Sequence, residues 1–169
     1  MAHHPLYAGS VPVFDHYLAQ LAALVDRTAG REHLLAARLA SDMFSAAQQV
    51  ATASGFALRV AYPLAGRAAP PEPAQDMDRI GLGRRIAAAR QALAELQPAD
   101  FDGAEARRIR HRAGFAELDQ STSEFLHLFG MPNFMFHASM AFAVLRREGL
   151  EIGKADFDGQ HDYPHGFRF

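Results

Sequence analysis

The chain has 169 residues, no cysteine, no tryptophan and a formal net charge of −2. The lack of cysteine excludes disulfides, thiolate nucleophiles and thiolate-bound metals, and the near-neutral charge gives no general attraction for nucleic acid. A hydrophobic content of 49% excludes a disordered chain. This length fits one domain with its own core, so we expect a single domain over 1–169, with 153–169 forming an extended C-terminal tail.

The N-terminus and the apolar stretches bear on location. The opening MAHHPLYAGSVPVF does not place a charged segment before an apolar run, so we expect no signal peptide. No run reaches the roughly 20 apolar residues of a membrane helix. The best candidate, Met131–Leu145, contains Asn133 and His137. We expect a soluble cytoplasmic protein with neither a membrane nor a nucleic acid as its partner.

Apolar residues recur at helical spacing in four parts of the chain. Alanine, which has the highest helix propensity, is frequent in all of them. The expected helices span residues 11–29, 42–64, 76–96 and 132–148. Ser10 is expected to cap the first helix, and Ser41 or Asp42 the second. Four amphipathic helices joined by polar connections predict an all-α four-helix bundle.

Two of the expected helices carry large side chains on their apolar stripes. Met43 and Phe44 lie on the stripe of the second helix, and Met77 and Ile80 on that of the third. Such a stripe normally faces the core. We therefore expect these four side chains to be buried.

The connections carry their own signals. A short turn is expected within Glu32–Ala40, and the proline-rich segment 67–75 is expected to form a stiff surface loop. Short alternations around Gly114 predict a small β-hairpin or an irregular excursion within Ala99–Gln120, before the last helix. Gly130-Met131-Pro132 is expected to break the last helical region in two.

His137 is the main candidate functional residue. It shares a helix face with Asn133 and Ala141, each four residues away. A zinc-binding helix typically carries two histidines at this spacing, whereas the second position here is Ala141. His137 is either a single histidine hydrogen-bonded inside the bundle or part of a ligand pocket. In a pocket it would act as general acid or base, because imidazole titrates near neutrality.

A glutamine on the second helix is the expected partner of His137. Gln48 and Gln49 interrupt an apolar helix. Either both face solvent, or one faces inward and meets His137 to form the polar floor of a pocket. The predicted ligand-binding residues are Asn133 and Gln48, with Asp42 and Tyr17 as further candidates. Tyr17 fits the apolar stripe of the first helix, with its hydroxyl at a rim.

The run from Arg107 to Arg112 is the densest basic segment. Such clusters can bind nucleic acid, but acidic residues on both sides would neutralise much of their field. These are Asp100, Asp102, Glu105, Glu117 and Asp119. We therefore expect a solvated hairpin with local ion pairs rather than a nucleic-acid patch.

Four stretches of the chain together resemble a known family. They are YAGSVPVFDHYLAQLAALVD, LLAARLASDMFSAAQQV, ADFDGAE and MPNFMFHASMAFAVLRREGLEIGKADF, in this order from Tyr7 to Gly159. The phrases ARLASDMF and PNFMFHASMAFAVLRREG are the most specific. The chain resembles the bacterial DUF1993 family, a domain of unknown function within the DinB/YfiT-like superfamily of putative metalloenzymes.

The resemblance implies a four-helix bundle of up-down-down-up type, usually dimeric. In that superfamily three histidines commonly hold a divalent metal, one from the second helix and two from an H-x-x-x-H pair in the fourth. Here His137 matches one position of the pair, Ala141 stands at the other, and Gln48 or Gln49 replaces the histidine of the second helix. No cofactor is therefore predicted, and Zn²⁺ or Ni²⁺ would find only His137 of the usual ligands.

Two function classes follow from these observations. The protein is either an enzyme that has lost its metal, with a small-molecule pocket around His137, or a non-catalytic ligand-binding or stress-associated bundle. In both cases we expect a homodimer formed through an apolar, alanine-rich helix face. The enzyme hypothesis requires His137 and Gln48 to approach within hydrogen-bond distance around an open cavity.

Overall fold

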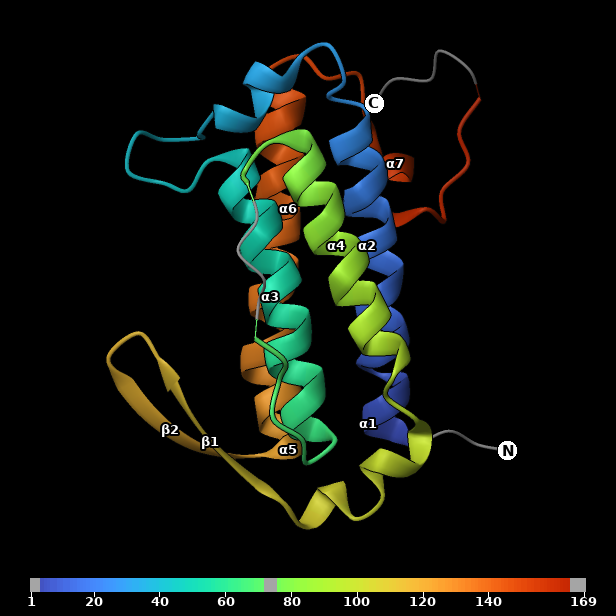
Figure 1. Cartoon of the computed structure of the whole chain (residues 1–169), viewed down its shortest axis with the longest axis vertical. Coiled ribbons are helices and arrows are strands. Elements are labelled where there is room, and N and C mark those ends of the chain that lie inside the picture. The colour runs from blue at the N-terminus through green and yellow to red at the C-terminus, as the bar shows by residue number, and fades with distance from the viewer. Residues whose placement is uncertain (1–3, 72–75, 165–169) are drawn as a thin grey trace.

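The computed structural model describes residues 4–71 and 76–164. Its four long helices lie side by side (Figure 1): α2 (Val11–Asp26), α3 (Ala46–Leu64), α4 (Arg79–Ala94) and α6 (Met131–Arg147). Helix α3 packs on α6 and α4, and α2 packs on α4. In Figure 1, α2 and α6 run upward while α3 and α4 run downward. The chain is thus mostly helical as predicted, although a two-stranded sheet makes the description all-α too narrow.

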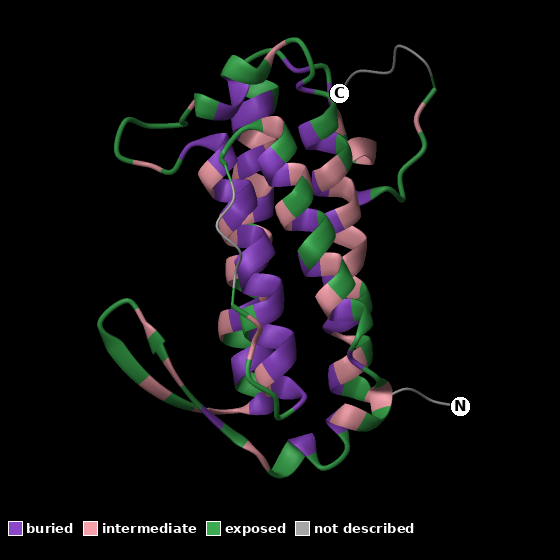
Figure 2. Ribbon diagram, viewed as in Figure 1, coloured by how far each residue is buried: buried purple, intermediate pink, exposed green. Residues whose placement is uncertain are grey.

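Small side chains let α3 and α6 approach closely. Ala53 and Ala57 on α3 and Ala138 and Ala141 on α6 are completely buried. Figure 2 shows α3 buried along almost its whole length. A helix buried on every side needs small residues wherever a neighbouring backbone comes near, because larger side chains would hold the helices apart. The high alanine content therefore serves helix packing as well as helix propensity.

Helix α3 begins later than predicted. Its cap is Ser45, whose Oγ accepts from the Gln48 backbone N–H at 3.3 Å, while Gln48 Oε1 accepts from the Ser45 N–H at 2.9 Å. This reciprocal capping box satisfies two free amides of the first turn. The expected caps Ser41 and Asp42 lie in an exposed turn, and Phe44, expected in the core, is 47% exposed because it precedes the helix.

Helices α2 and α4 also begin differently from expectation. A short helix α1 (Pro5–Ala8) precedes α2, and the Ser10 hydroxyl donates back to it instead of capping α2. Helix α4 is capped by Asp78, whose Oδ1 accepts from the Gly81 N–H at 2.7 Å. Met77 therefore lies outside the helix and Ile80 in its first, outward turn, so the prediction that both are buried was wrong.

The predicted hairpin is present. Strands β1 (Arg108–Ala113) and β2 (Ala116–Ser121) pair antiparallel, and Gly114 turns between them at φ +60°. Short 3-10 turns at Pro98–Phe101 and Ala104–Ala106 lead into it, and another, Glu32–Ala36, precedes α3 as expected. The strands extend sideways from the lower end of the helices (Figure 1).

The last helix is continuous, contrary to the predicted break. A short helix α5 (Thr122–Glu124) passes into a π-helical turn, Phe125–Gly130, and then into α6. The Met131 N–H reaches back five residues to Leu126 O, and such a wide turn carries a helix through Gly130 and Pro132 without breaking it. Gly130 lies so close to α3 that a Cβ there would stand 2.6 Å from Val60 Cγ1.

This continuous helix also changes the expectation about membrane spans. The 26 residues Thr122–Arg147 are long and apolar enough to cross a membrane by length and composition, and they are the one such helix among the described residues. A core helix of a soluble protein meets the same criteria. Here one face of the helix packs on α3 and α2, and Phe134, Ala138 and Ala141 on it are completely buried.

The segment after α6 is more ordered than an extended tail. Helix α7 (Lys154–Asp158) packs on α2. The Phe157 ring lies 5.5 Å from that of Tyr17 and 5.6 Å from that of Phe142, and His16 Nε2 donates to the backbone oxygen of Asp158 at 2.6 Å. The expected tail therefore docks through an aromatic cluster, and only its last residues, 165–169, lie outside the described part.

Candidate functional site

His137 and Gln49 form the polar contact between the two most closely packed helices. The Nδ1–H of His137 on α6 donates to Oε1 of Gln49 on α3 at 2.7 Å. Gln49 is 2% exposed, and His137 is half-buried. Because an amide oxygen can only accept, the contact places a proton on Nδ1 and leaves the Nε2 lone pair available in the neutral ring. Nε2 has no hydrogen-bond partner within 4–71 and 76–164.

Two phenylalanine rings stack on the His137 ring. The Phe44 and Phe56 rings have centroids 6.1 Å and 5.5 Å from it and interplanar angles of 21° and 22°. The Phe136 ring meets it edge-on at 5.2 Å. This aromatic surround replaces water around the imidazole, and burial lowers the pKa of His137 below 6.5. Burial therefore favours the neutral ring, and the stacked rings restrict its orientation.

The structure corrects the identity of the glutamine. We predicted Gln48 as the pocket residue, but its side-chain oxygen is engaged in the capping box with Ser45. The adjacent Gln49 faces inward instead. The start of α3 decides this, because a helix capped at Ser45 turns position 49 toward α6. Positions 49 and 56 lie two turns apart on one helix face, which is why Gln49 and Phe56 both reach His137.

The other predicted ligand-binding residues are spread over the molecule. Asn133 lies one turn before His137, and its Nδ2 donates to Phe129 O at 2.7 Å. Tyr17 packs in the aromatic cluster with Phe157, and Asp42 is exposed in the turn before α3. Asn133 is therefore the one member of this predicted set, besides Gln48, that lines a hollow near His137.

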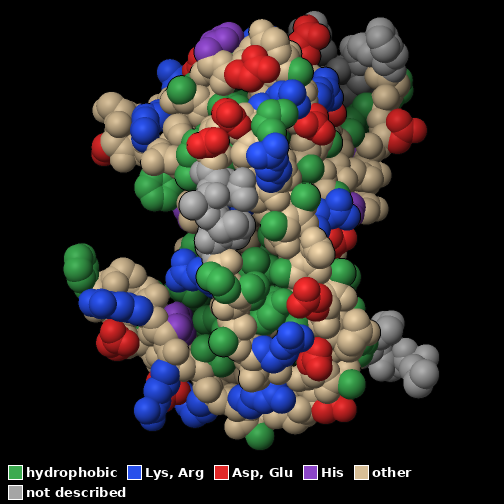
Figure 3. All heavy atoms as spheres, in the orientation of Figure 1, with side chains coloured by type: hydrophobic (Ala, Val, Ile, Leu, Met, Phe, Trp, Pro, Cys, Tyr) green, Lys and Arg blue, Asp and Glu red, His purple; other side chains and the backbone are tan. Residues whose placement is uncertain are grey.

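Two hollows flank the aromatic stack. One, of about 350 Å³, is lined by Phe44, Gln48 and Arg59 among others. The other, of about 390 Å³, lies between α3, the last helix and the turn of the hairpin, and includes Phe56, Arg59 and Asn133. His137 lines neither, but one of its stacked rings belongs to each. In the space-filling view the hairpin forms a separate lobe with a notch above it (Figure 3).

Sequence reasoning missed Phe56 and Arg59. Phe56 lies two turns after Gln49 on one face of α3, and Arg59 lies one turn after Phe56, so the helical spacing held the signal. The guanidinium carbon of Arg59 lies 4.8 Å from the Phe56 ring centre, which places a cation against the same ring that stacks on His137.

The residues around His137 do not fit a three-histidine metal site. Nδ1 is used by Gln49, whose oxygen is a poor ligand for zinc or nickel. Position 141, where the superfamily pattern has histidine, is a completely buried alanine. Within the described residues, no three His, Asp or Glu side chains are placed to hold a metal ion together. No chemical step at this site is therefore derived through a metal.

Comparisons with known proteins place the chain in a family. Residues 6–158 match the model of the domain of unknown function DUF1993. A crystal structure of a DinB family member protein from Shewanella denitrificans superposes with a TM-score of 0.81 at 30% identity, covering 94% of each chain. No curated protein sequence matches the chain. The chain therefore belongs to the DUF1993 family and has the fold of DinB family proteins.

Proposed function

We propose that this DinB-like protein binds a small molecule beside His137 without a metal, with neutral His137 as a hydrogen-bond acceptor and candidate general base. The observation that carries the proposal is the 2.7 Å contact from His137 Nδ1 to Gln49 Oε1. In the proposal this contact takes the place of the metal contacts that the resemblance to the superfamily implies. It also directs the imidazole so that Nε2 alone remains available to a ligand.

The protonation state of His137 supports this role. A general base must be unprotonated at the working pH and must reach the proton it accepts. Burial lowers the pKa of His137, so the base form predominates at neutral pH. The Gln49 oxygen would then stabilise the imidazolium formed when Nε2 takes a proton, because Nδ1–H donates more strongly in the charged ring.

A purely binding role is the alternative, and one observation favours it. No second titratable side chain within the described residues hydrogen-bonds to His137, so a relay of acid and base groups is missing. In that case Nε2 accepts a hydrogen bond from a bound molecule and no proton moves. Both versions predict a metal-free site and differ only in whether a bound compound is converted.

Two measurements test the metal-free site. Elemental analysis of the purified protein, together with thermal shifts in Zn²⁺ and Ni²⁺, should find no stoichiometric metal and no stabilisation that depends on His137. Long-range ¹H–¹⁵N NMR should show His137 as the neutral Nδ1–H tautomer at pH 7. One equivalent of metal lost in His137→Ala, or a ring protonated at pH 7, would contradict the proposal.

The proposal includes a cytoplasmic homodimer formed through the outer side of the last helix. Residues 125–145 contain no charged side chain, yet only 33% of the most apolar 18-residue window of this helix is buried. Leu128 and Phe136 are 70% and 50% exposed. A second copy of the same uncharged face can pack there without stranding a charge. Light scattering at micromolar concentration should give twice the chain mass, and a monomer would refute the dimer.

A further inference from the structure

The hollow at the turn of the hairpin combines aromatic walls with positive charge. Its volume is about 390 Å³, within the range of sites for small molecules, roughly 300–1,000 Å³. Phe56 and Phe129 form apolar walls, while Arg59 and Arg112 reach it from α3 and from strand β1. No acidic side chain lines it. The hollow therefore offers aromatic side chains and cations but no carboxylate of its own.

Arg59 differs from several other arginines of the chain. Arg108 and Arg110 share the Asp119 carboxylate, and Arg90 is paired with Asp15. Arg59 forms no ion pair with any residue of the described ranges, and its guanidinium lies over the Phe56 ring. A guanidinium that stacks on a ring keeps its in-plane N–H donors free for an anion. Arg59 is thus oriented by an aromatic ring and left without a carboxylate.

Arg112 supplies a second cation to the same hollow. It is paired with Glu117 at 3.4 Å, and the two side chains are 64% and 79% exposed. Pairs this open contribute little to stability and exchange readily with solvent or ligands. Arg112 can therefore turn to an anion in the hollow at small cost.

The remaining lining fixes the orientation of a bound ring. The Phe56 and Phe129 rings are 5.8 Å apart at 60°. The Phe56 ring is stacked on His137 and lies under Arg59, and the Phe129 ring meets His111 and Phe125, so both rings offer edges rather than open faces to the hollow. Asn133 donates its amide N–H to Phe129 O, so its Oδ1 is directed as an acceptor and is not used by any described residue. A bound planar ring can receive these edges on its own face, in edge-to-face contact, while a polar substituent reaches Asn133.

From these contacts we propose that the hollow binds a small planar aromatic carboxylate. The ring packs against Phe56 and Phe129, and the carboxylate lies between Arg59 and Arg112, which match its two oxygens through charge-assisted hydrogen bonds. This assignment rests on the proposed small-molecule function and names its ligand class. Because Phe56 also stacks on His137 at 5.5 Å, a ring bound against Phe56 should change the NMR signals of the imidazole.

The binding test uses 2-naphthoate as the probe. The chain has tyrosines but no tryptophan, so naphthoate can be excited at wavelengths that the protein does not absorb. Saturable one-to-one binding is expected, and neutral 2-naphthamide should bind about tenfold more weakly or worse, as expected for lost charge-assisted hydrogen bonds. Cyclohexanecarboxylate, an anion without an aromatic face, should compete poorly. Naphthoate should also shift the His137 ring signals.

Three variants localise the site. Arg59→Met and Arg112→Met should each weaken naphthoate binding about tenfold. Arg110→Met is the matched control, because Arg110 lies on the same strand but pairs with Asp119 outside the hollow; its affinity should stay within about twofold of the parent. Circular dichroism verifies the fold of each variant, and Arg112→Met alone decides if Arg59→Met does not fold.

Several outcomes would overturn the assignment. They are equal binding of naphthoate and naphthamide, unchanged affinity in both Arg59→Met and Arg112→Met, an equal loss in Arg110→Met, or no saturable binding. None of these results alters the metal content or the tautomer of His137. The ligand class and the metal-free site therefore fail separately.

Discussion

Replacing Gln49 by leucine tests the contact on which the site depends. Leucine is similar in size and apolar, so the variant removes the acceptor of the 2.7 Å bond and leaves His137 Nδ1–H in a mostly apolar surround. Leaving a buried donor unsatisfied costs about 1–3 kcal/mol. For a chain of this size each kcal/mol lowers the melting temperature by about 2–4 °C. Gln49→Leu should therefore melt several degrees below the parent.

A double-mutant cycle separates this contact from general packing. His137→Leu alone should leave the Gln49 amide oxygen without its partner and cost a similar amount, about 1–3 kcal/mol. The double variant Gln49→Leu, His137→Leu removes both polar groups, so its loss should be smaller than the sum of the two single losses. Urea unfolding followed by circular dichroism supplies the free energies of unfolding of the parent and the three variants.

The result that would refute the reasoning is additivity. If the double variant loses the sum of the single losses, the two side chains do not act through one another, and the short distance carries no energy. A loss below about 0.5 kcal/mol in Gln49→Leu would have the same meaning, since that is the usual range for surface changes. Gln48→Leu is a useful comparison, because it removes only the capping contact to Ser45, a loss of about 1 kcal/mol.

Three further predictions follow. Gly130→Ala should destabilise the fold by about 1–3 kcal/mol, because the added Cβ would stand 2.6 Å from Val60. Adding Val60→Ala should recover part of the lost stability. Equal melting temperatures of Gly130→Ala and the parent would contradict the close approach of the two helices. Burial lowers the pKa of His137 in the folded state below 6.5, so the unfolded chain binds more protons as the pH falls, and the free energy of unfolding decreases on acidification through this range. His137→Gln should reduce this dependence of the unfolding free energy on pH, measured by urea unfolding at a series of pH values. An unchanged pH dependence would assign it to other groups. Gln49→His combined with Ala141→His should give a chain that binds Zn²⁺ by calorimetry, while the single variants should bind it weakly; a double variant without zinc affinity would show that these positions do not converge.

Local sequence signals predicted much of the fold. The helical periodicities located all four long helices, and Gly114 located the turn of the hairpin because only a residue tolerant of positive φ fits there. Helix starts were predicted less well. The pattern Ser45-x-x-Gln48 is a capping box that is visible in the sequence. It predicts that the Gln48 side chain binds the Ser45 backbone, which leaves Gln49 as the glutamine that faces inward.

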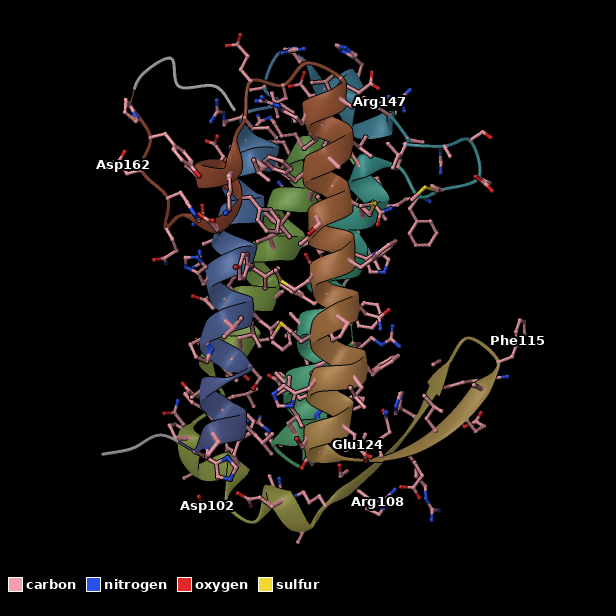
Figure 4. The ribbon with its side chains drawn as sticks, turned by 180° about the vertical axis from the view of Figure 1, so that it is seen from behind. Asp102, Arg108, Phe115, Glu124, Arg147 and Asp162 are labelled. Carbon is pink, nitrogen blue, oxygen red and sulfur yellow. The ribbon has the colours of Figure 1, made fainter. Side chains whose placement is uncertain are left out.

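Other features depend on contacts between distant segments. The π-helical turn ending at Gly130 arises where the last helix meets Val60 of α3, and the sequence alone suggested a break there. The hollow near Arg59 exists because the hairpin turn stands opposite α3. In Figure 4 the hairpin projects from the bundle and Phe115 at its tip points away from it, so the direction of the hairpin, which no periodicity encodes, decides which residues line the hollow.

The arrangement of His137 argues against a purely structural histidine. A core histidine is expected to satisfy both ring nitrogens and to be sealed from solvent. Here Gln49 satisfies Nδ1 alone, Nε2 has no partner in the described part of the chain, and the ring is only half-buried. Two aromatic rings hold the imidazole flat between two hollows. An oriented imidazole with one unpaired nitrogen, whose two stacked rings each line a hollow, supports the proposed ligand site better than a structural role does.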